Sequence, residues 1–126
     1  MRTIENDLLT EKIIGCAIEV HRGLGPGLLE SAYEECLCFE LRQAQLGHRK
    51  EVRLPILYKA VKLDCGYRMD IVVEDRVVIE LKTVDRLMPI HEAQLLTYLK
   101  LSRIKTGLLL NFNSAALKDG LRRLVL

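Results

Sequence analysis

Two short runs of apolar and β-branched residues restrict the folds open to this chain more than any other feature. They span residues 69–73 and 77–81, and only the charged residues Glu74, Asp75 and Arg76 separate them. Apolar runs of this length, rich in valine and isoleucine and joined by a short polar segment, are typical of a β-hairpin. We therefore expect two antiparallel strands here, at the centre of the fold.

Charged side chains are expected at the open end of this hairpin. Because side chains alternate along a strand, Glu80 and Lys82 leave the same face while Leu81 points away. Asp70, near the start of the first strand, can lie beside the end of the second. Two carboxylates in one patch repel each other, and a hard divalent cation with oxygen ligands relieves that repulsion. The patch therefore predicts a site for magnesium or manganese.

Such a site can cleave nucleic acid. Bound magnesium polarises a phosphodiester and lowers the pKa of its water, to about 7 in the best cases. Lys82 would orient that water or stabilise the charge developing on phosphate. The same residues also fit a solvated strand face with a surface ion pair, which contributes only about 0 to 1 kcal/mol to stability. Taken alone, the pattern does not separate these interpretations.

The remaining periodicity predicts helices on both sides of the hairpin in the sequence, and further strands. Apolar positions at helical spacing and glycine stops predict helices over about residues 4–21 and 28–46, and a third over 87–102 that starts near Pro89. Strands are expected over about residues 49–58, 61–65, 106–111 and 122–126, with a short turn at Lys59 and Ala60. This order, ααββββαββ, predicts an α/β fold with a mixed central sheet flanked by helices. A chain of 126 residues is long enough for one such domain, residues 1–126.

The charged patch and the helix that follows it resemble a known group of enzymes. Asp70 and Glu80-x-Lys82 on consecutive strands, followed by a helix with Gln94-x-x-x-Tyr98, resemble the PD-(D/E)XK nuclease superfamily, in particular its RecB-like branch. The resemblance implies a restriction-endonuclease-like core and metal-dependent hydrolysis of phosphodiester bonds, with DNA favoured as the substrate. It also implies that the Leu81 carbonyl is a metal ligand beside the two carboxylates.

A second motif lies at the start of the second predicted helix. Gly27-x-x-Glu30-x-x-Tyr33 is similar to the signature of the small GxxExxY family, which is assigned to the same superfamily. The resemblance implies that Glu30 adds an acidic group to the active site. On the residues alone, Glu30 also fits simple complementation of the helix dipole. Tyr33 is expected to contact substrate, or else to pack in the core.

The third predicted helix has an unusually polar face. His91, Gln94 and Tyr98 follow helical spacing, and a buried glutamine without partners is costly. We therefore expect Gln94 to face the carboxylates and to bond Glu80 or a phosphate oxygen, and Tyr98 to contact the substrate backbone. His91 fits either the site or the surface.

Composition leaves the partners open. A net charge of +2 neither supports nor excludes nucleic-acid binding. With six aromatic residues and no tryptophan, stacking on single strands is not expected. There is no signal-peptide pattern and no apolar run of about 18 residues, so we expect a cytoplasmic protein that does not enter membranes. The four cysteines all precede Glu80 and lack metal-site spacing, which favours incidental or structural thiols.

One alternative of a different class remains open. The chain could be a non-catalytic nuclease-fold module that binds nucleic acid or a protein, although Asp70, Glu80 and Lys82 are all present. A domain of this size leaves no room for separate DNA recognition. Specificity is therefore expected to come from a homodimer or from a partner protein.

Overall fold

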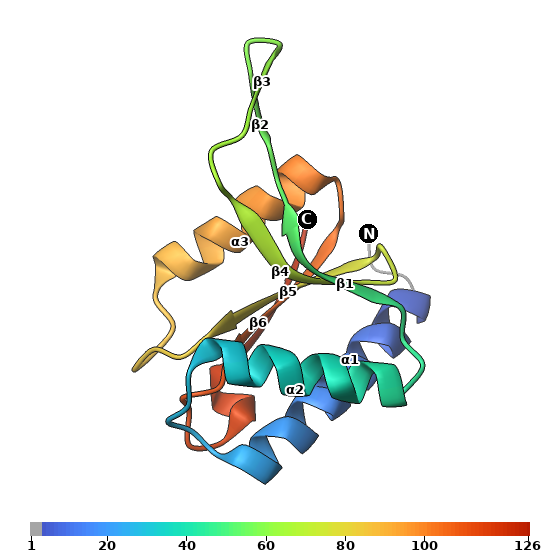
Figure 1. The fold of residues 1–126 in the computed structure, drawn as a ribbon, viewed down its shortest axis with the longest axis vertical. Helices are drawn as coiled ribbons and strands as arrows, with labels where there is room; N and C mark the ends of the chain where they lie inside the picture. Colours follow the sequence, from blue (N-terminus) through green and yellow to red (C-terminus); the bar gives the residue numbers. More distant parts are fainter. Residues whose placement is uncertain (1–3) are drawn as a thin grey trace.

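The structure, a computed structural model, describes residues 4–126 (Figure 1). Its helices are α1 (Ile4–Leu24), α2 (Glu30–Gln43) and α3 (Pro89–Ser102), with a short 3-10 helix η1 (Leu117–Gly120). Its strands are β1 (His48–Arg53), β2 (Ile56–Tyr58), β3 (Val61–Leu63), β4 (Arg68–Val73), β5 (Val77–Lys82), β6 (Thr106–Asn111) and β7 (Leu121–Val125).

Five of the strands form one mixed sheet in the order β1-β4-β5-β6-β7. The pairs β1–β4, β4–β5 and β6–β7 are antiparallel, whereas β5 and β6 are parallel and are connected through α3. The predicted hairpin is β4–β5, closed by Val73 opposite Val77. Glu74 and Asp75 both have φ of +54°, as a type I′ turn requires. The predicted mixed sheet flanked by helices is confirmed.

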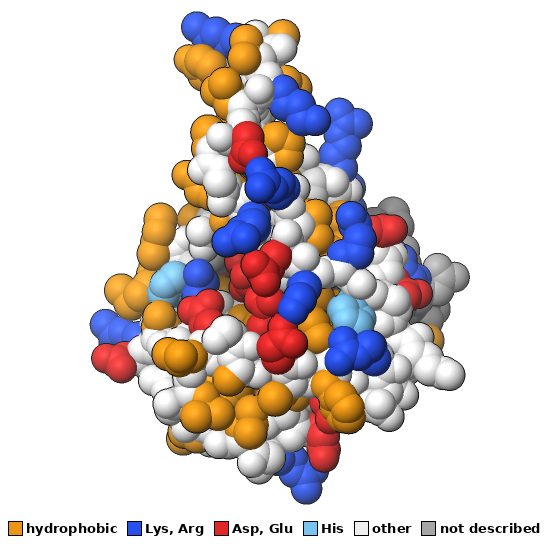
Figure 2. Space-filling model, in the orientation of Figure 1, with side chains coloured by type: hydrophobic (Ala, Val, Ile, Leu, Met, Phe, Trp, Pro, Cys, Tyr) orange, Lys and Arg blue, Asp and Glu red, His pale blue; other side chains and the backbone are white. Residues whose placement is uncertain are grey.

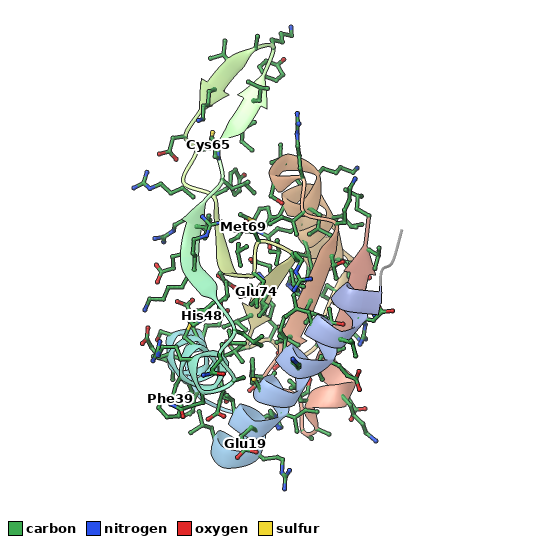
Figure 3. All side chains as sticks on the ribbon, turned by 90° about the vertical axis from the view of Figure 1, so that its right-hand side faces the viewer. Glu19, Phe39, His48, Cys65, Met69 and Glu74 are labelled. Atoms are coloured by element: carbon green, nitrogen blue, oxygen red, sulfur yellow. The ribbon has the colours of Figure 1, made fainter. Side chains whose placement is uncertain are left out.

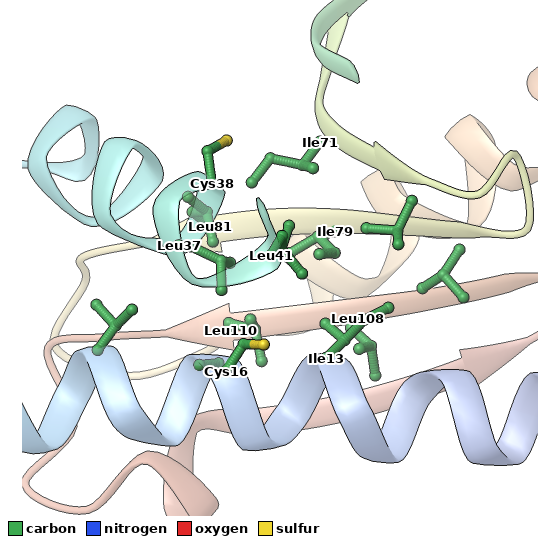
Figure 4. Packing of buried hydrophobic residues seen from close by; sticks show 14 of the residues in the cluster. Ile13, Cys16, Leu37, Cys38, Leu41, Ile71, Ile79, Leu81, Leu108 and Leu110 are labelled. Atoms are coloured by element: carbon green, nitrogen blue, oxygen red, sulfur yellow. The ribbon is translucent and has the colours of Figure 1, made fainter. Parts of the chain in front are cut away.

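The helices cover the sheet in two layers. One face packs against α1 and α2, and the other packs against α3 (Figure 1). Figure 4 shows the first layer, in which sheet residues lie among helix residues: Ile79, Leu81, Leu108 and Leu110 with Ile13, Cys16, Leu37 and Leu41. Val78 instead joins the cluster on the α3 side. The alternation along β5 therefore sends Leu81 into the core and places Glu80 and Lys82 on the α3 side.

A single strand over residues 49–58 was the wrong prediction. The strand stops at Arg53, because Leu54 turns into the core and Pro55 has no N–H group for a strand ladder. The Leu54 N–H donates to the Tyr67 carbonyl at 2.9 Å, which closes the base of a loop. Beyond that base, β2 and β3 pair only with each other and project from the body (Figures 1 and 3). The chain thus has five strands, not four, between α2 and α3. We call residues 53–68 the arm.

Both N-terminal helices differ from prediction at their ends. Helix α1 continues to Leu24 and stops before Gly25, which has φ of +67°. Helix α2 starts at Glu30 and ends at Gln43, three residues before the predicted end. The chain turns at Gln45, whose φ is +58°, so that Leu46 can bury its side chain in the core.

Tyr33 is part of the core. Its ring is fully buried and stacks on Phe112 with ring centroids 4.6 Å apart. Its hydroxyl donates to the Gly25 carbonyl at 2.5 Å and accepts from the Leu28 N–H at 3.2 Å. Of the two roles expected for Tyr33, packing in the core is therefore the one that the structure shows, and the buried side chain fastens the glycine-rich loop to that core.

The described residues also bear on two expectations from composition. All four cysteines are free thiols, and Cys16 and Cys38 are buried. No helix within residues 4–126 is both long enough and apolar enough to cross a bilayer.

The role of Tyr33 can be tested by removing its hydroxyl. Tyr33→Phe should lower the free energy of unfolding by about 1 kcal/mol, because the Gly25 carbonyl and the Leu28 N–H lose their partner. Chemical denaturation measures this loss. Tyr58→Phe makes the same change on the exposed arm and should stay within about 0.5 kcal/mol of the parent. Equal stability of the two variants would contradict the role given to Tyr33.

Candidate active site

Asp70 and Glu80 hold the open end of the β4–β5 hairpin together through reciprocal bonds. Regular pairing of the two strands runs only as far as Ile71 with Ile79. Beyond it, the Asp70 N–H donates to Glu80 Oε2 at 2.8 Å, and the Leu81 N–H donates to Asp70 Oδ2 at 2.8 Å. Each carboxylate thus takes the place of a backbone partner on the other strand.

The pairing of β4 with its other neighbouring strand, β1, is also irregular beside Asp70. The β1–β4 register pairs Lys50 with Ile71 and Val52 with Met69, and passes over Glu51. Glu51 has φ of +51°, a conformation that L-residues rarely adopt and that occurs preferentially at functional sites. Its side chain lines the same cleft as Asp70. No sequence signal announced this irregularity.

Burial raises the pKa of both carboxyl groups, so they are weaker acids than usual. Glu80 is only 4% exposed, and burial, followed by the negative charge of Asp70, raises its pKa to about 8. Burial also raises the pKa of Asp70, against the opposing effects of the Leu81 N–H and the Lys82 ammonium. A cation bound between the two groups would offset both causes.

Lys82 leaves β5 on the same face as Glu80 and meets helix α3. Its Nζ donates to Gln94 Oε1 at 3.3 Å, and Gln94 Nε2 donates to the Tyr98 hydroxyl at 3.1 Å. Gln94 and Tyr98 therefore share the face of α3 that was predicted to meet the patch. Gln94 accepts from Lys82, however, and does not bond Glu80, which was one of the two partners expected for it. The amide holds the ammonium group in place without neutralising it.

Acidic residues of α2 form the opposite wall. Glu30, in the first turn, has a pKa raised by burial and by the negative charge of Asp70, while the Lys82 ammonium lowers it. Glu34, one turn later, has a pKa raised to about 7 by burial and by its neighbours Glu51 and Asp70. The predicted approach of Glu30 to the patch agrees with these interactions. Glu34 was not predicted as a site residue, although its i, i+4 spacing from Glu30 places both on the same face of the helix.

These side chains surround one cleft of about 460 Å³. Figure 2 shows acidic side chains gathered in the middle of this face, below the arm, with basic side chains beside them. Tyr67 and Arg68, from the arm, complete its upper rim. His91 has another role, because its Nδ1 accepts from the Met88 N–H at 2.9 Å at the start of α3.

The oxygen donors of the cleft fit a hard divalent cation. Asp70 and Glu80 each use one oxygen on a backbone N–H and retain a second oxygen. The Lys82 carbonyl bonds the Phe112 N–H of the β6 side, so the preceding carbonyl, that of Leu81, points toward Asp70. Within residues 4–126, no three His, Cys, Asp or Glu side chains already enclose an ion position.

The raised pKa of Glu80 predicts how stability depends on pH without metal. Between pH 4.5 and about 8 the folded chain keeps a proton that the unfolded chain releases, so stability should fall as pH rises. Glu80→Gln should remove much of this dependence on pH. At pH 9 in EDTA, its free energy of unfolding should be about 2 kcal/mol higher than that of the parent. Denaturation at pH 5, 7 and 9 measures it.

Glu19→Gln removes an exposed carboxylate of α1 (Figure 3) and controls for the loss of one charge. A Glu80→Gln profile that runs parallel to the parent at all pH values would show that Glu80 is not buried and protonated as described.

Comparison with known proteins agrees with this geometry. The family model described as PD-(D/E)XK nuclease superfamily matches residues 7–124. Searches of curated proteins and of solved structures found no match. The matched region contains the sheet up to Leu124 near the end of β7, the three helices beyond the first residues of α1, and every residue that lines the cleft. By this match the chain belongs to the PD-(D/E)XK nuclease superfamily, whose membership indicates a metal-dependent nuclease.

Proposed function

We propose that this protein hydrolyses phosphodiester bonds of nucleic acid with the help of magnesium or manganese, at a site formed by Asp70, Glu80 and Lys82. One observation carries the proposal. Carboxylates from adjacent strands, each accepting from a backbone N–H of the opposite strand, meet an ammonium group at the floor of an open cleft. A structural ion pair needs neither the second buried carboxylate nor the cleft.

Three groups are proposed to hold the metal: the free oxygens of Asp70 and Glu80, and the Leu81 carbonyl. When bound there, a divalent ion supplies Lewis-acid activation of the phosphate and of the attacking water. The protein's own contribution is to hold these oxygens in place, because all three belong to the open end of the β4–β5 hairpin. The two N–H bonds restrict how far either carboxylate can turn.

Lys82 is proposed to stabilise negative charge that develops on the phosphate. Its ammonium group is directed by the Gln94 amide, whose other end is tied to the Tyr98 hydroxyl. Because the Gln94 amide is neutral, this hydrogen bond directs the ammonium group without cancelling its charge. Glu30 is proposed as a further acidic group facing the reacting phosphate, and Tyr98 as a contact to the substrate backbone.

The resemblance to the GxxExxY family and to the RecB-like branch supports DNA over RNA. Within the described chain the cleft presents phosphate-binding and metal-binding groups, and no side chain is assigned to base recognition there. Sequence specificity is therefore proposed to come from a homodimer or from a partner protein.

Cleavage assays test the proposal. The parent should cut labelled DNA only with magnesium or manganese, and RNA serves as the comparison substrate. Asp70→Asn, Glu80→Gln and Lys82→Met should each lower the rate by about 100-fold or more, because each removes a charge from the reacting phosphate or its metal.

Matched controls are available on the same elements. Asp75→Asn changes a carboxylate in the turn at the far end of the hairpin, and Lys100→Met changes an exposed lysine of α3. Both should retain the parental rate. A parent protein that cuts no DNA or RNA with either metal would contradict the proposal, and would favour a non-catalytic binding module.

A further inference from the structure

A second hollow lies between the arm and α3, directly beside the carboxylate cleft. It is an apolar groove of about 340 Å³, and its lining includes Tyr67, Ile90, Thr97 and Tyr98. Tyr67, Gln94 and Tyr98 line both hollows. One bound molecule can therefore occupy the cleft and the groove at the same time.

The groove has the character of a site for a flat ring. Tyr67 is half-exposed and meets Tyr98 edge to face, with ring centroids 6.3 Å apart. Ile90, which is also exposed, forms part of the apolar wall. Thr97 and Gln94 supply polar groups at the margins. A nucleobase has this combination of apolar faces and polar edges, and stacking on an aromatic side chain stabilises it.

The charge of the arm favours a phosphate chain over an apolar protein segment. Residues 53–68 hold four basic side chains and one acidic one, a net charge of +3 in a chain whose total is +2. The basic residues are Arg53, Lys59, Lys62 and Arg68. Arg53 pairs with Asp64 and Arg68 pairs with Glu51, but both partners of each pair are exposed to solvent. Exposed pairs of this kind are weak and can give way to phosphate.

The arm also exposes several apolar side chains, namely Leu57, Tyr58, Val61 and Leu63. A two-stranded ribbon by itself is marginally stable in water, and contiguous exposed apolar surface marks an interaction site. Apolar and aromatic side chains between lysines and arginines are the surface that unpaired nucleotides contact through both bases and phosphates.

We infer that the substrate is nucleic acid with unpaired bases: the arm binds the phosphates of a single strand, and a base next to the reacting phosphate enters the groove beside Tyr67. The inference rests on the proposed nuclease function and narrows its substrate to single strands or unpaired ends. A paired duplex is disfavoured, because moving one base out of the stack costs a few kcal/mol. This inference departs from the expectation that stacking on single strands plays no part, because two of the six aromatic residues, Tyr67 and Tyr98, meet at the groove.

Binding without cleavage tests the inference separately from the chemistry. In EDTA, fluorescence anisotropy should show labelled oligothymidylate bound about tenfold more tightly than a blunt duplex of equal length. Tyr67→Ala should weaken single-strand binding by about tenfold, whereas Tyr67→Phe should retain it. Ile90→Asp, at an exposed position that tolerates a charge, should weaken binding similarly.

Phe39→Ala is the matched control, because Phe39 is equally exposed but lies on α2, remote from the arm (Figure 3). Equal affinity for single strand and duplex, or equal effects of Tyr67→Ala and Phe39→Ala, would overturn the inference. So would a dimer by light scattering that Tyr67→Ala dissociates, without any single-strand preference. Metal-dependent cleavage that ignores strandedness would overturn this inference but keep the nuclease. Single-strand binding that depends on Tyr67, without any cleavage, would support the binding site and contradict the nuclease function.

Discussion

The reciprocal bonds between Asp70 and Glu80 and the backbone of the opposite strand are the interaction on which the site depends. They occur because the hairpin brings the start of β4 beside the end of β5, at the point where regular pairing stops. Burial raises the pKa of both carboxyl groups, and the negative charge of Asp70 raises the pKa of Glu80 further. The resulting demand for positive charge is met by Lys82 and, in our proposal, by a divalent cation.

The rest of the fold positions groups around that point. Alternation along β5 anchors Leu81 in the core and leaves Glu80 and Lys82 on the α3 side. Helix α3 then directs Lys82 through Gln94, and the start of α2 brings Glu30 from the other layer. The arm extends the same surface toward the groove. The cleft is therefore built from five separate stretches of chain: the start of α2, β1, the end of the arm with β4, β5 and α3.

The parts that could be predicted from sequence are those set by local periodicity. The two-residue repeat of a strand predicts the hairpin and the opposite directions of Leu81 and Glu80. The 3.6 residues per turn of a helix predict that Gln94 and Tyr98 share a face. The arm was missed because Leu54 turns inward before Pro55, and an alternating pattern runs through both. The stacking of Tyr33 on Phe112 and the meeting of Tyr67 with Tyr98 depend on tertiary packing between distant segments, which periodicity does not encode.

The most direct test of the account is the position of a bound metal ion. Crystals soaked in manganese chloride should give an anomalous peak about 2.1 Å from a carboxylate oxygen of Asp70, one of Glu80 and the Leu81 carbonyl, the spacing of a small hard ion. A soak in which Asp70 and Glu80 keep their backbone bonds and no manganese lies between them would contradict the central claim. The two carboxylates would then only stabilise the hairpin and would not bind a metal ion.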